Sequence, residues 1–362
     1  MADATGFLVR VSNFLYAVIT KLVSVVTAPV HPRKALYGCD MLSVSLRRFT
    51  WSLLLLGAAS VASAGSIGLS EAGGFNLLVW KNATLLNSDT EGSVAVGGNA
   101  SFNAYSIGTK SPVTNSGTGV FVVGGSLTAN NGQVSSGSVY VGGTYSGPGY
   151  NLTSAAGSGV YSGLGAGGLP FNFASAQTAL SGKSTAYAGF TANGLAQMNY
   201  STLTLTGTDT GLNVFNITAG ELASASGLAI NAAAGSHVLI NVSGSVADFS
   251  SKGIWGTFDR TQTLFNFYEA TSLEMKSIGI EGSILAPFAD VKFWSGQMNG
   301  QLIANSFSGE TWGVGEMHQH PFVDQPSSQP PQGVPDAGST GLLAILALAG
   351  LVSARRWQAT RR

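Results

Sequence analysis

Cysteine and charged residues are scarce in this 362-residue sequence. The one cysteine, Cys39, precedes the region that we expect to form the mature domain, which excludes a disulfide framework, a thiolate metal site and a thiol nucleophile there. Between Gly65 and Phe322, seven Lys and Arg stand against thirteen Asp and Glu, a formal charge of −6. Nucleic-acid binding needs a clustered basic face, which this region lacks, so nucleic acid is excluded as a partner.

The N-terminal residues have the pattern of an export signal. Residues 1–40 are typical of neither a signal peptide nor a folded module, and we interpret them as a misassigned start or a disordered extension. From residue 41, a basic segment, an apolar run and the small residues Ala62, Ser63 and Ala64 follow in the order of a signal peptide. The apolar run is shorter than the roughly 20 residues of a membrane span. We therefore expect signal peptidase to remove residues 41–64 and leave Gly65 as the first residue.

The C-terminal residues also fall into three parts. Residues 323–333 are rich in proline and polar side chains, so they cannot bury enough apolar area to fold, and we interpret them as a linker. Residues 334–362 contain a short motif, an apolar run from 341 to 354 and a basic end. The motif consists of Val334, Pro335, Asp336, Ala337 and Gly338.

This arrangement resembles the PEP-CTERM class of exosortase sorting signals, in the variant that begins Val-Pro-Asp-Ser-Gly. Ala337 stands where that variant has serine. The resemblance implies an exosortase-like enzyme as a partner, and contact with a membrane through the hydrophobic helix. A plain tail anchor with arginines on the cytoplasmic side is the alternative.

Short segments that end in paired glycines recur in the middle of the chain. Segments 93–99, 120–126 and 138–144 each place β-branched or aromatic residues before Gly-Gly, and these glycine pairs are 27 and 18 residues apart. Gly282 and Gly300, also 18 apart, each begin a second shared pattern. The same turn chemistry at the same point of each unit favours stacked coils of a parallel β-solenoid, with Gly282 beside Gly300. A β-sandwich is the alternative.

One helix is expected to accompany this β-structure. Residues 173–180 are rich in Ala, Gln and Leu, and Gly182 then weakens or ends the helix, with a continuation to Phe190 left open. Strand-forming residues return in segments 203–205, 214–217 and 238–242. The predicted fold class is therefore all-β, a β-solenoid with one α-helix, a signal helix before it and a hydrophobic helix after it.

The same residues resemble a bacterial family of adhesive domains. Segments 75–80 and 87–98 resemble the start of the choice-of-anchor A domain. Its latter half is similar to the following residues of this chain: segments 238–244, 282–287 and 299–304, with Glu316, His318 and Phe322. We therefore treat residues 65–322 as one domain. The resemblance implies a β-helical surface domain that different bacteria attach by different anchors, with no catalytic residues.

The candidate metal ligands are Glu316, His318 and His320. In an extended strand alternate residues share a face, so a carboxylate and two imidazoles could meet there and hold zinc. A terminal strand that presents polar groups to solvent explains the same residues. Asp89 and Glu91 alternate in the same way, but their neighbours favour a structural turn. We expect no cofactor.

We predict a non-catalytic protein that is exported to the envelope, outer surface or extracellular matrix of a Gram-negative-type bacterium. It would be adhesive or structural, with matrix polysaccharide or a host or neighbouring surface as its partner.

Two alternatives remain open. A polysaccharide-active enzyme would need two carboxylates that converge on one cleft. Candidates for that role are Asp259, Glu269, Glu274, Glu281 and Asp290. Ice or carbohydrate binding by a flat face is suggested by the Ser- and Thr-rich run 201–206, and would need Thr at matching positions on several strands.

Overall fold

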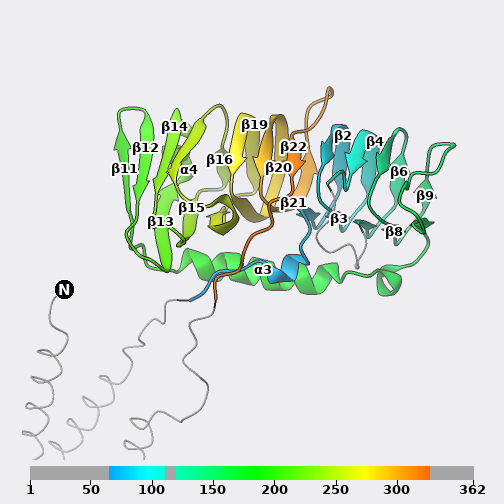
Figure 1. Cartoon of the computed structure of the whole chain (residues 1–362), viewed down its shortest axis with the longest axis horizontal. Helices are drawn as coiled ribbons and strands as arrows, with labels where there is room; N and C mark the ends of the chain where they lie inside the picture. The colour runs from blue at the N-terminus through cyan, green and yellow to red at the C-terminus, as the bar shows by residue number, and fades with distance from the viewer. Residues whose placement is uncertain (1–64, 111–119, 327–362) are drawn as a thin grey trace, which may run out of the picture. The chain divides into compact units, whose positions relative to one another are not determined.

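A computed structural model describes residues 65–110 and 120–326 (Figure 1). These residues form twenty-two strands and two α-helices, which confirms the all-β class. In the part of the chain that the structure describes, no helix is long and apolar enough to span a membrane.

The targeting segments lie outside the described residues. This holds for the extension 1–40, the signal peptide 41–64, the sorting segment 334–362 and most of the linker 323–333. The signal helix and the hydrophobic C-terminal helix therefore stay predictions.

One ladder of parallel strands runs the length of the domain, and we call it the main ladder. Its strands, in spatial order, are β13 (Leu212–Thr218), β15 (His237–Ser243), β18 (Thr263–Asn266), β20 (Ser283–Asn299), β21 (Leu302–Ser308), β1 (Leu77–Val79), β3 (Val94–Val96), β5 (Phe121–Val123), β8 (Val139–Val141) and β10 (Val160–Tyr161). Leu302 pairs with Ile284 on one side and with Leu77 on the other. The first strand of the domain thus lies mid-ladder, beside a strand from the other end of the chain.

Two further parallel ladders lie beside the main ladder. The second ladder is β9 (Tyr145–Ser146), β6 (Leu127–Ala129), β4 (Ala100–Ile107), β2 (Ala83–Thr90), β21, β20, β19 (Ser272–Glu281) and β16 (Val246–Asp248). The third ladder is β7 (Gly132–Val134), β4, β2, β22 (Glu316–His318), β20 and β19. Strands β2, β4, β19 and β20 are long enough to contribute to both.

These long strands bend at residues in the left-handed region of backbone space. Asn87 on β2 and Ala104 on β4 have φ of 51° and 49°, and the pairs that flank them in sequence are in register. Ser277 on β19 and Ser295 on β20 have φ of 50° and 56° and occupy the equivalent place. Non-glycine residues seldom adopt this conformation, so a stack of such bends forms the corner between the second and third ladders.

A separate four-stranded sheet completes one end of the domain. It contains β11 (Leu195–Asn199), β12 (Thr202–Thr206), β14 (Gly227–Asn231) and β17 (Gly253–Thr257). Strands β11 and β12 are antiparallel, whereas β12, β14 and β17 are parallel.

Helix α3 (Phe173–Ala188) joins the two ends of the main ladder (Figure 1). The chain begins in the middle of the ladder and proceeds outward to β10. The helix then runs back along the strands, and the chain restarts at β11 and returns to the middle at β21. Strands of the main ladder are therefore covered on one face by the helix and on the other by the domain interior.

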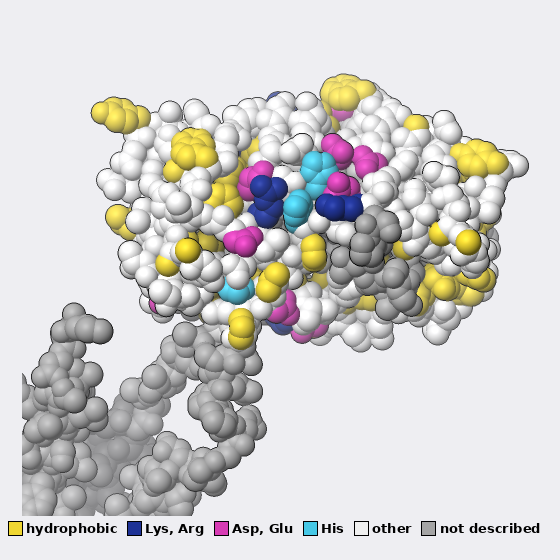
Figure 2. Space-filling view, viewed as in Figure 1, with side chains coloured by type: hydrophobic (Ala, Val, Ile, Leu, Met, Phe, Trp, Pro, Cys, Tyr) yellow, Lys and Arg dark blue, Asp and Glu magenta, His cyan; other side chains and the backbone are white. Residues whose placement is uncertain are grey.

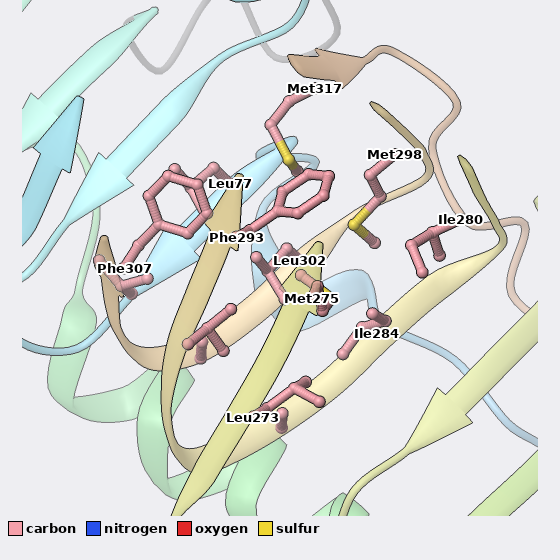
Figure 3. Packing of buried hydrophobic residues seen from close by; sticks show 14 of the residues in the cluster. Leu77, Leu273, Met275, Ile280, Ile284, Phe293, Met298, Leu302, Phe307 and Met317 are labelled. Atoms are coloured by element: carbon pink, nitrogen blue, oxygen red, sulfur yellow. The ribbon is translucent and has the colours of Figure 1, made fainter. Parts of the chain in front are cut away.

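Alternate residues of the main ladder fill two different hydrophobic clusters. Leu77 and Val79 point into the interior, whereas Leu78 between them packs in the cluster that includes Ala176 and Leu180 of α3. Figure 3 shows Leu77 of β1 among interior side chains from the C-terminal strands, Phe293 and Leu302 included. This double burial explains why the strands of the main ladder consist of consecutive apolar residues.

Helix α3 begins where the Asn172 side chain accepts a hydrogen bond from the Ser175 backbone N–H, at 3.0 Å. The helix continues through Gly182 to Ala188, so the weakening expected at Gly182 does not end it. The prediction of a single helix is wrong, because a second helix, α4 (Ala219–Ser224), is present. It begins with a capping box between Thr218 and Glu221, a signal that the sequence contains.

The recurring glycines are required by close contact between neighbouring strands. A Cβ atom on Gly124 would lie 2.2 Å from the Gly97 carbonyl oxygen, and one on Gly142 would lie 2.3 Å from that of Gly124. One on Gly300 would likewise lie 2.2 Å from the Gly282 oxygen. These segments pair in parallel, as the repeat spacing predicts, and not antiparallel as in the sandwich alternative.

The two ends of the described domain are hydrogen-bonded to each other. The Gln325 backbone N–H donates to the Ile67 carbonyl at 2.8 Å, and the Ile67 N–H donates to the Gln325 side chain at 3.3 Å. The Leu69 N–H donates to Asp324 at 2.7 Å. Both ends therefore leave the domain at one place, near α3 (Figure 1).

Candidate functional sites

Two candidate motifs that are far apart in the sequence form one site. Thr90 on β2 pairs with Met317 on β22, which places Asp89 beside Glu316 and Glu91 beside His318. We call Asp89, Glu91, Glu316, His318 and Lys110 the seam cluster. The structural turn that the residues around Asp89 and Glu91 favour is wrong for residues 87–90, which belong to β2, and only residues 91–92 lie beyond the strand. Figure 2 shows charged and His side chains gathered near the middle of one face, with uncharged surface on both sides.

Hydrogen bonds fix the His318 ring within this cluster. Its Nδ1 lies 2.7 Å from the Asn299 side-chain oxygen, and its Nε2 lies 3.2 Å from a Glu316 carboxylate oxygen. The Asn299 amide in turn donates to Glu281 at 2.9 Å, and Glu281 pairs with Arg260 at 3.0 Å. Both ring nitrogens of His318 are therefore already engaged.

The predicted ligands Glu316, His318 and His320 are not gathered into one metal site. Strand β22 ends at His318, and the His320 N–H donates to the His318 carbonyl at 3.0 Å, so the chain turns before His320. The alternation that would align all three side chains does not extend that far. Across residues 65–110 and 120–326, no group of three or more His, Cys, Asp and Glu is arranged to hold a metal ion.

The two acidic residues of β2 and its end have opposite pKa shifts. Burial raises the pKa of Asp89, a hydrogen bond from Thr109 at 3.0 Å opposes this, and the adjacent Glu316 adds to it. Burial also acts to raise the pKa of Glu91, but the Gln319 N–H at 2.7 Å and Lys110 at 3.2 Å outweigh it, and the pKa is lowered. The pKa of His320 is lowered by burial and by the charges of Arg260 and Lys110.

A row of exposed hydroxyl groups crosses the second ladder. Thr84, Ser101, Thr128 and Ser146 are in register on β2, β4, β6 and β9, and all four are exposed. We call them the hydroxyl row. Neighbouring strands lie about 4.8 Å apart, so the row is a regular array of groups that both donate and accept hydrogen bonds.

The edge of this row is held rigid by side chains that bond the next strand. Asn82 accepts from the Asn99 N–H at 2.9 Å, Asn99 from the Ser126 N–H at 2.8 Å, and Ser126 from the Thr144 N–H at 3.1 Å. Each side chain thus fixes the strand beside it.

Three members of the hydroxyl row, Thr84, Ser101 and Thr128, line a shallow groove. One depression of about 400 Å³ is lined by Asn82, Thr84, Asn99, Ser101, Ser126 and Thr128. A second, of about 320 Å³, shares Asn82 and Thr84 with the first and continues to Ser306 and Ser308 of β21. The groove therefore crosses the strands and passes the place where β2, from the first part of the domain, pairs with β21, from the last part.

The sequence pointed to a different Thr-rich run. Thr202, Thr204 and Thr206 on β12 pair with Gly227, Ala229 and Asn231 on β14, so no matching Thr lies on the next strand. The hydroxyl row was missed, although the glycine pairs mark it. Ser101, Thr128 and Ser146 each stand three residues after the second glycine of a pair.

Comparison with known proteins assigns the domain. A family described as "Putative Ice-binding-like adhesive domain" matches residues 68–319, well over half of the chain. The chain belongs to this family. The VPDSG-CTERM motif matches residues 333–356. These matches confirm an adhesive domain of the choice-of-anchor kind followed by a PEP-CTERM-like sorting signal.

This ice-binding-like adhesive domain is also similar to solved structures. An ice-binding protein from the Antarctic ascomycete Antarctomyces psychrotrophicus is 13% identical, with 73% of this chain and 100% of that chain covered and a TM-score of 0.33. A glycosylated ice-binding protein, LeIBP, from an Arctic yeast is 12% identical, with 75% and 98% covered and a TM-score of 0.31. No curated protein matches the chain.

An adhesive domain with a C-terminal sorting motif marks an exported, cell-surface protein, and the motif implies a processing system that acts on the C-terminus.

Most carboxylates of the enzyme alternative have local structural partners in this adhesive domain. Asp259 accepts from the Thr261 N–H at 2.8 Å, and Glu269 accepts from the Gly244 N–H at 2.8 Å. Asp290 accepts from the Asn305 and Ser306 side chains, both at 2.7 Å.

Proposed function

We propose that this protein is an adhesin of the cell surface or extracellular matrix, and that the groove containing the hydroxyl row is its adhesive surface. In this proposal the tail is held in a membrane, and an exosortase-like enzyme then recognises Val334–Gly338 and processes the chain. The three ladders would be the sides of a parallel β-solenoid. The support for that description is the in-register parallel pairing of consecutive segments on each ladder.

The groove is the observation on which the proposal depends. It is elongated across strands, lined mainly by Ser, Thr and Asn, and regular at about 4.8 Å per strand. A hydroxyl array of this kind matches a ligand that is itself extended, hydrated and repetitive. Extracellular polysaccharide has these properties, and the matrix or the surface of a neighbouring cell supplies it.

Cell adhesion tests the proposal with the full-length protein at its natural location. A triple variant, Thr84→Val, Ser101→Ala and Thr128→Val, removes three hydroxyls of the row at exposed positions. We expect it to abolish most adhesion to polysaccharide-coated surfaces while the surface level of the protein is unchanged. Thr178→Ala removes an exposed hydroxyl from α3 and serves as the matched control. Adhesion by the triple variant at the native level would refute the proposal.

Ice binding is a second candidate, favoured by the same regular row of hydroxyls on rigid strands. A direct measurement on the purified protein distinguishes ice binding from polysaccharide adhesion. Inhibition of ice recrystallisation that the triple variant loses would support ice as the ligand, and polysaccharide adhesion without such inhibition would support the first candidate.

In this proposal the protein has no enzymatic activity. Incubation of the purified protein with the polysaccharides to which it adheres should release no reducing ends or unsaturated sugars. Release of either product would support the polysaccharide-active alternative instead.

A further inference from the structure

The four-stranded sheet β11, β12, β14 and β17 has a surface that the adhesive groove does not include. Its four strands contain no Asp, Glu, Lys or Arg. They carry hydroxyl and amide side chains and one large aromatic residue, Trp255 on β17, which is 50% exposed. A half-exposed indole on the edge strand of an uncharged sheet needs a physical explanation.

The six-membered ring of the indole lies over the positions of two glycines. A Cβ on Gly227 would be 2.3 Å from Cη2 of Trp255, and one on Gly253 would be 3.3 Å from its Cζ3. Neither glycine is among the residues with positive φ, so the backbone conformation does not require glycine at either place. Glycine is required there because a side chain would occupy the space under the ring. One face of the indole is thus packed on the sheet.

The register places small and polar side chains on the β14 side of the ring. Ala229 and Thr204 occupy the row of Trp255, with Gln197 on β11 at its end. In the adjacent row Gly227 is followed by Thr202 and Asn199. The Asn199 amide donates to the Thr204 hydroxyl at 3.2 Å, which orients both groups.

We propose that this surface, which we call the Trp255 platform, binds a neutral pyranose polysaccharide. The face of an aromatic ring carries negative charge density, which attracts the weakly positive C–H groups on the face of a sugar ring. Hydroxyl and amide groups beside the ring would bond the sugar hydroxyls. Acidic sugars are disfavoured, because the four strands offer no cation to pair with a carboxylate. This inference rests on one part of the proposed function, namely that the protein is exported and so meets extracellular polysaccharide.

Affinity electrophoresis of the full-length protein tests the platform. The probes are gels that contain a soluble neutral β-glucan, a neutral mannan or an acidic polyuronate. We expect at least one neutral polymer to retard the native protein and Trp255→Ala to weaken that binding about tenfold. Trp255→Phe should keep most of it. Gly227→Val keeps the indole but fills the space beneath it, and should weaken binding as Trp255→Ala does.

Matched controls separate the platform from the adhesive groove and from misfolding. Trp312→Ala removes an indole that is 63% exposed in the loop before β22, and should leave retardation unchanged. The hydroxyl-row triple variant keeps the platform, so adding Trp255→Ala to it should weaken any remaining retardation in the neutral gel, even if its adhesion is lost. Thermal unfolding should show that Trp255→Ala is still fully folded at the temperature of the electrophoresis, although its midpoint is lowered by the lost packing.

Three results would overturn the proposal. The first is equal retardation of the native protein and Trp255→Ala, and the second is preferential binding of the polyuronate. The third is a native dimer in light scattering that Trp255→Ala converts to a monomer, because the platform would then contact a second copy of the chain.

Discussion

Asp89 on β2 lies beside Glu316 on β22, so two carboxyl groups meet where the second strand of the domain pairs with the last. Each strand is held in place by its ladder, so the backbone positions of the two residues are fixed side by side. On the face shown in Figure 2, where the charged side chains gather near the middle, the pair is a local repulsion at the seam.

The pH dependence of this pair can be predicted in sign. The pKa of Asp89 is raised in the folded protein, so the folded state binds its proton more readily than the unfolded chain. Its contribution to stability is present at acid pH and is lost as pH rises through the folded pKa. Asp89→Asn removes the repulsion and can still accept the bond from Thr109. We expect it to raise the unfolding midpoint by about 1–2 °C at pH 7.

That gain should disappear as pH falls below about 4, because native Asp89 is then protonated as well. Asp259→Asn, which is exposed and can still accept the Thr261 N–H, is the control and should leave the midpoint nearly unchanged at both pH values. A gain that is constant across this pH range would contradict the prediction.

The paired glycines should tolerate no side chain. Gly142→Ala places a Cβ against the carbonyl oxygen of Gly124 on the neighbouring strand, and the strands must separate to relieve the contact. We expect a loss of roughly 2–4 kcal/mol in the free energy of unfolding. Gly182→Ala in α3 has open space around it and should gain about 0.5–1 kcal/mol. Urea denaturation measures both, and equal effects of the two substitutions would exclude this explanation.

Docking of α3 depends on a buried asparagine. Asn266 accepts from the Ser184 hydroxyl at 2.6 Å and donates to the Ser184 carbonyl and to Asn241, both at 2.9 Å. Asn266→Ala leaves these buried groups without partners and should cost about 2–3 kcal/mol. Asn216→Ala removes an exposed residue at the end of the same row and should cost about 1 kcal/mol or less. Denaturant titration that gives Asn216→Ala the larger cost would contradict this ranking.

Export should leave Gly65 at the N-terminus. N-terminal sequencing of the secreted protein checks this expectation, and a start at Met1 or Ala2 would refute it. Ala64→Leu should block cleavage and keep the precursor in the membrane, because signal peptidase needs a small residue there. Ser63→Leu is the control, since the middle position of the motif is permissive.

The tail should be absent from the mature surface protein. The apolar run 341–354 is shorter than the roughly 20 residues that span a bilayer comfortably, so permanent anchoring by it alone would be weak. Mass spectrometry should find no peptide beyond about Thr340. Pro335→Ala with Asp336→Ala should leave the uncleaved form in the membrane. Peptides that contain Trp357 in correctly localised native protein would show that the tail is an anchor.

Local patterns in the sequence predicted the parallel pairing well. Glycine at 124, 142 and 300 is required by a carbonyl oxygen on the next strand, so the spacing of glycines records the register. The start of helix α3 is also predictable from local sequence, because Ala and Leu have high intrinsic helix propensity. The hydroxyl row is also predictable, because aligning the three repeats on their glycine pairs places Ser101, Thr128 and Ser146 at the same position.

The seam and the corners could not be predicted in this way. The pairing of Leu77 with Leu302 joins segments more than 200 residues apart, and neither segment carries a mark of the other. The seam cluster depends on that pairing, so its two halves appeared as separate motifs. The bends at Ser277 and Ser295 have positive φ without glycine, and are stabilised by neighbours in the stack.

The central position of β1 has a consequence for the order of folding. One edge of β1 is covered early by β3, but the other edge waits for β21, which is synthesised more than 200 residues later. Until then its N–H and C=O groups on that side are free to pair with another chain, which is an aggregation hazard. Contacts of such long sequence separation also form slowly. Secretion factors or chaperones that shield an unpaired strand edge would therefore be needed most by the half of the domain that emerges first.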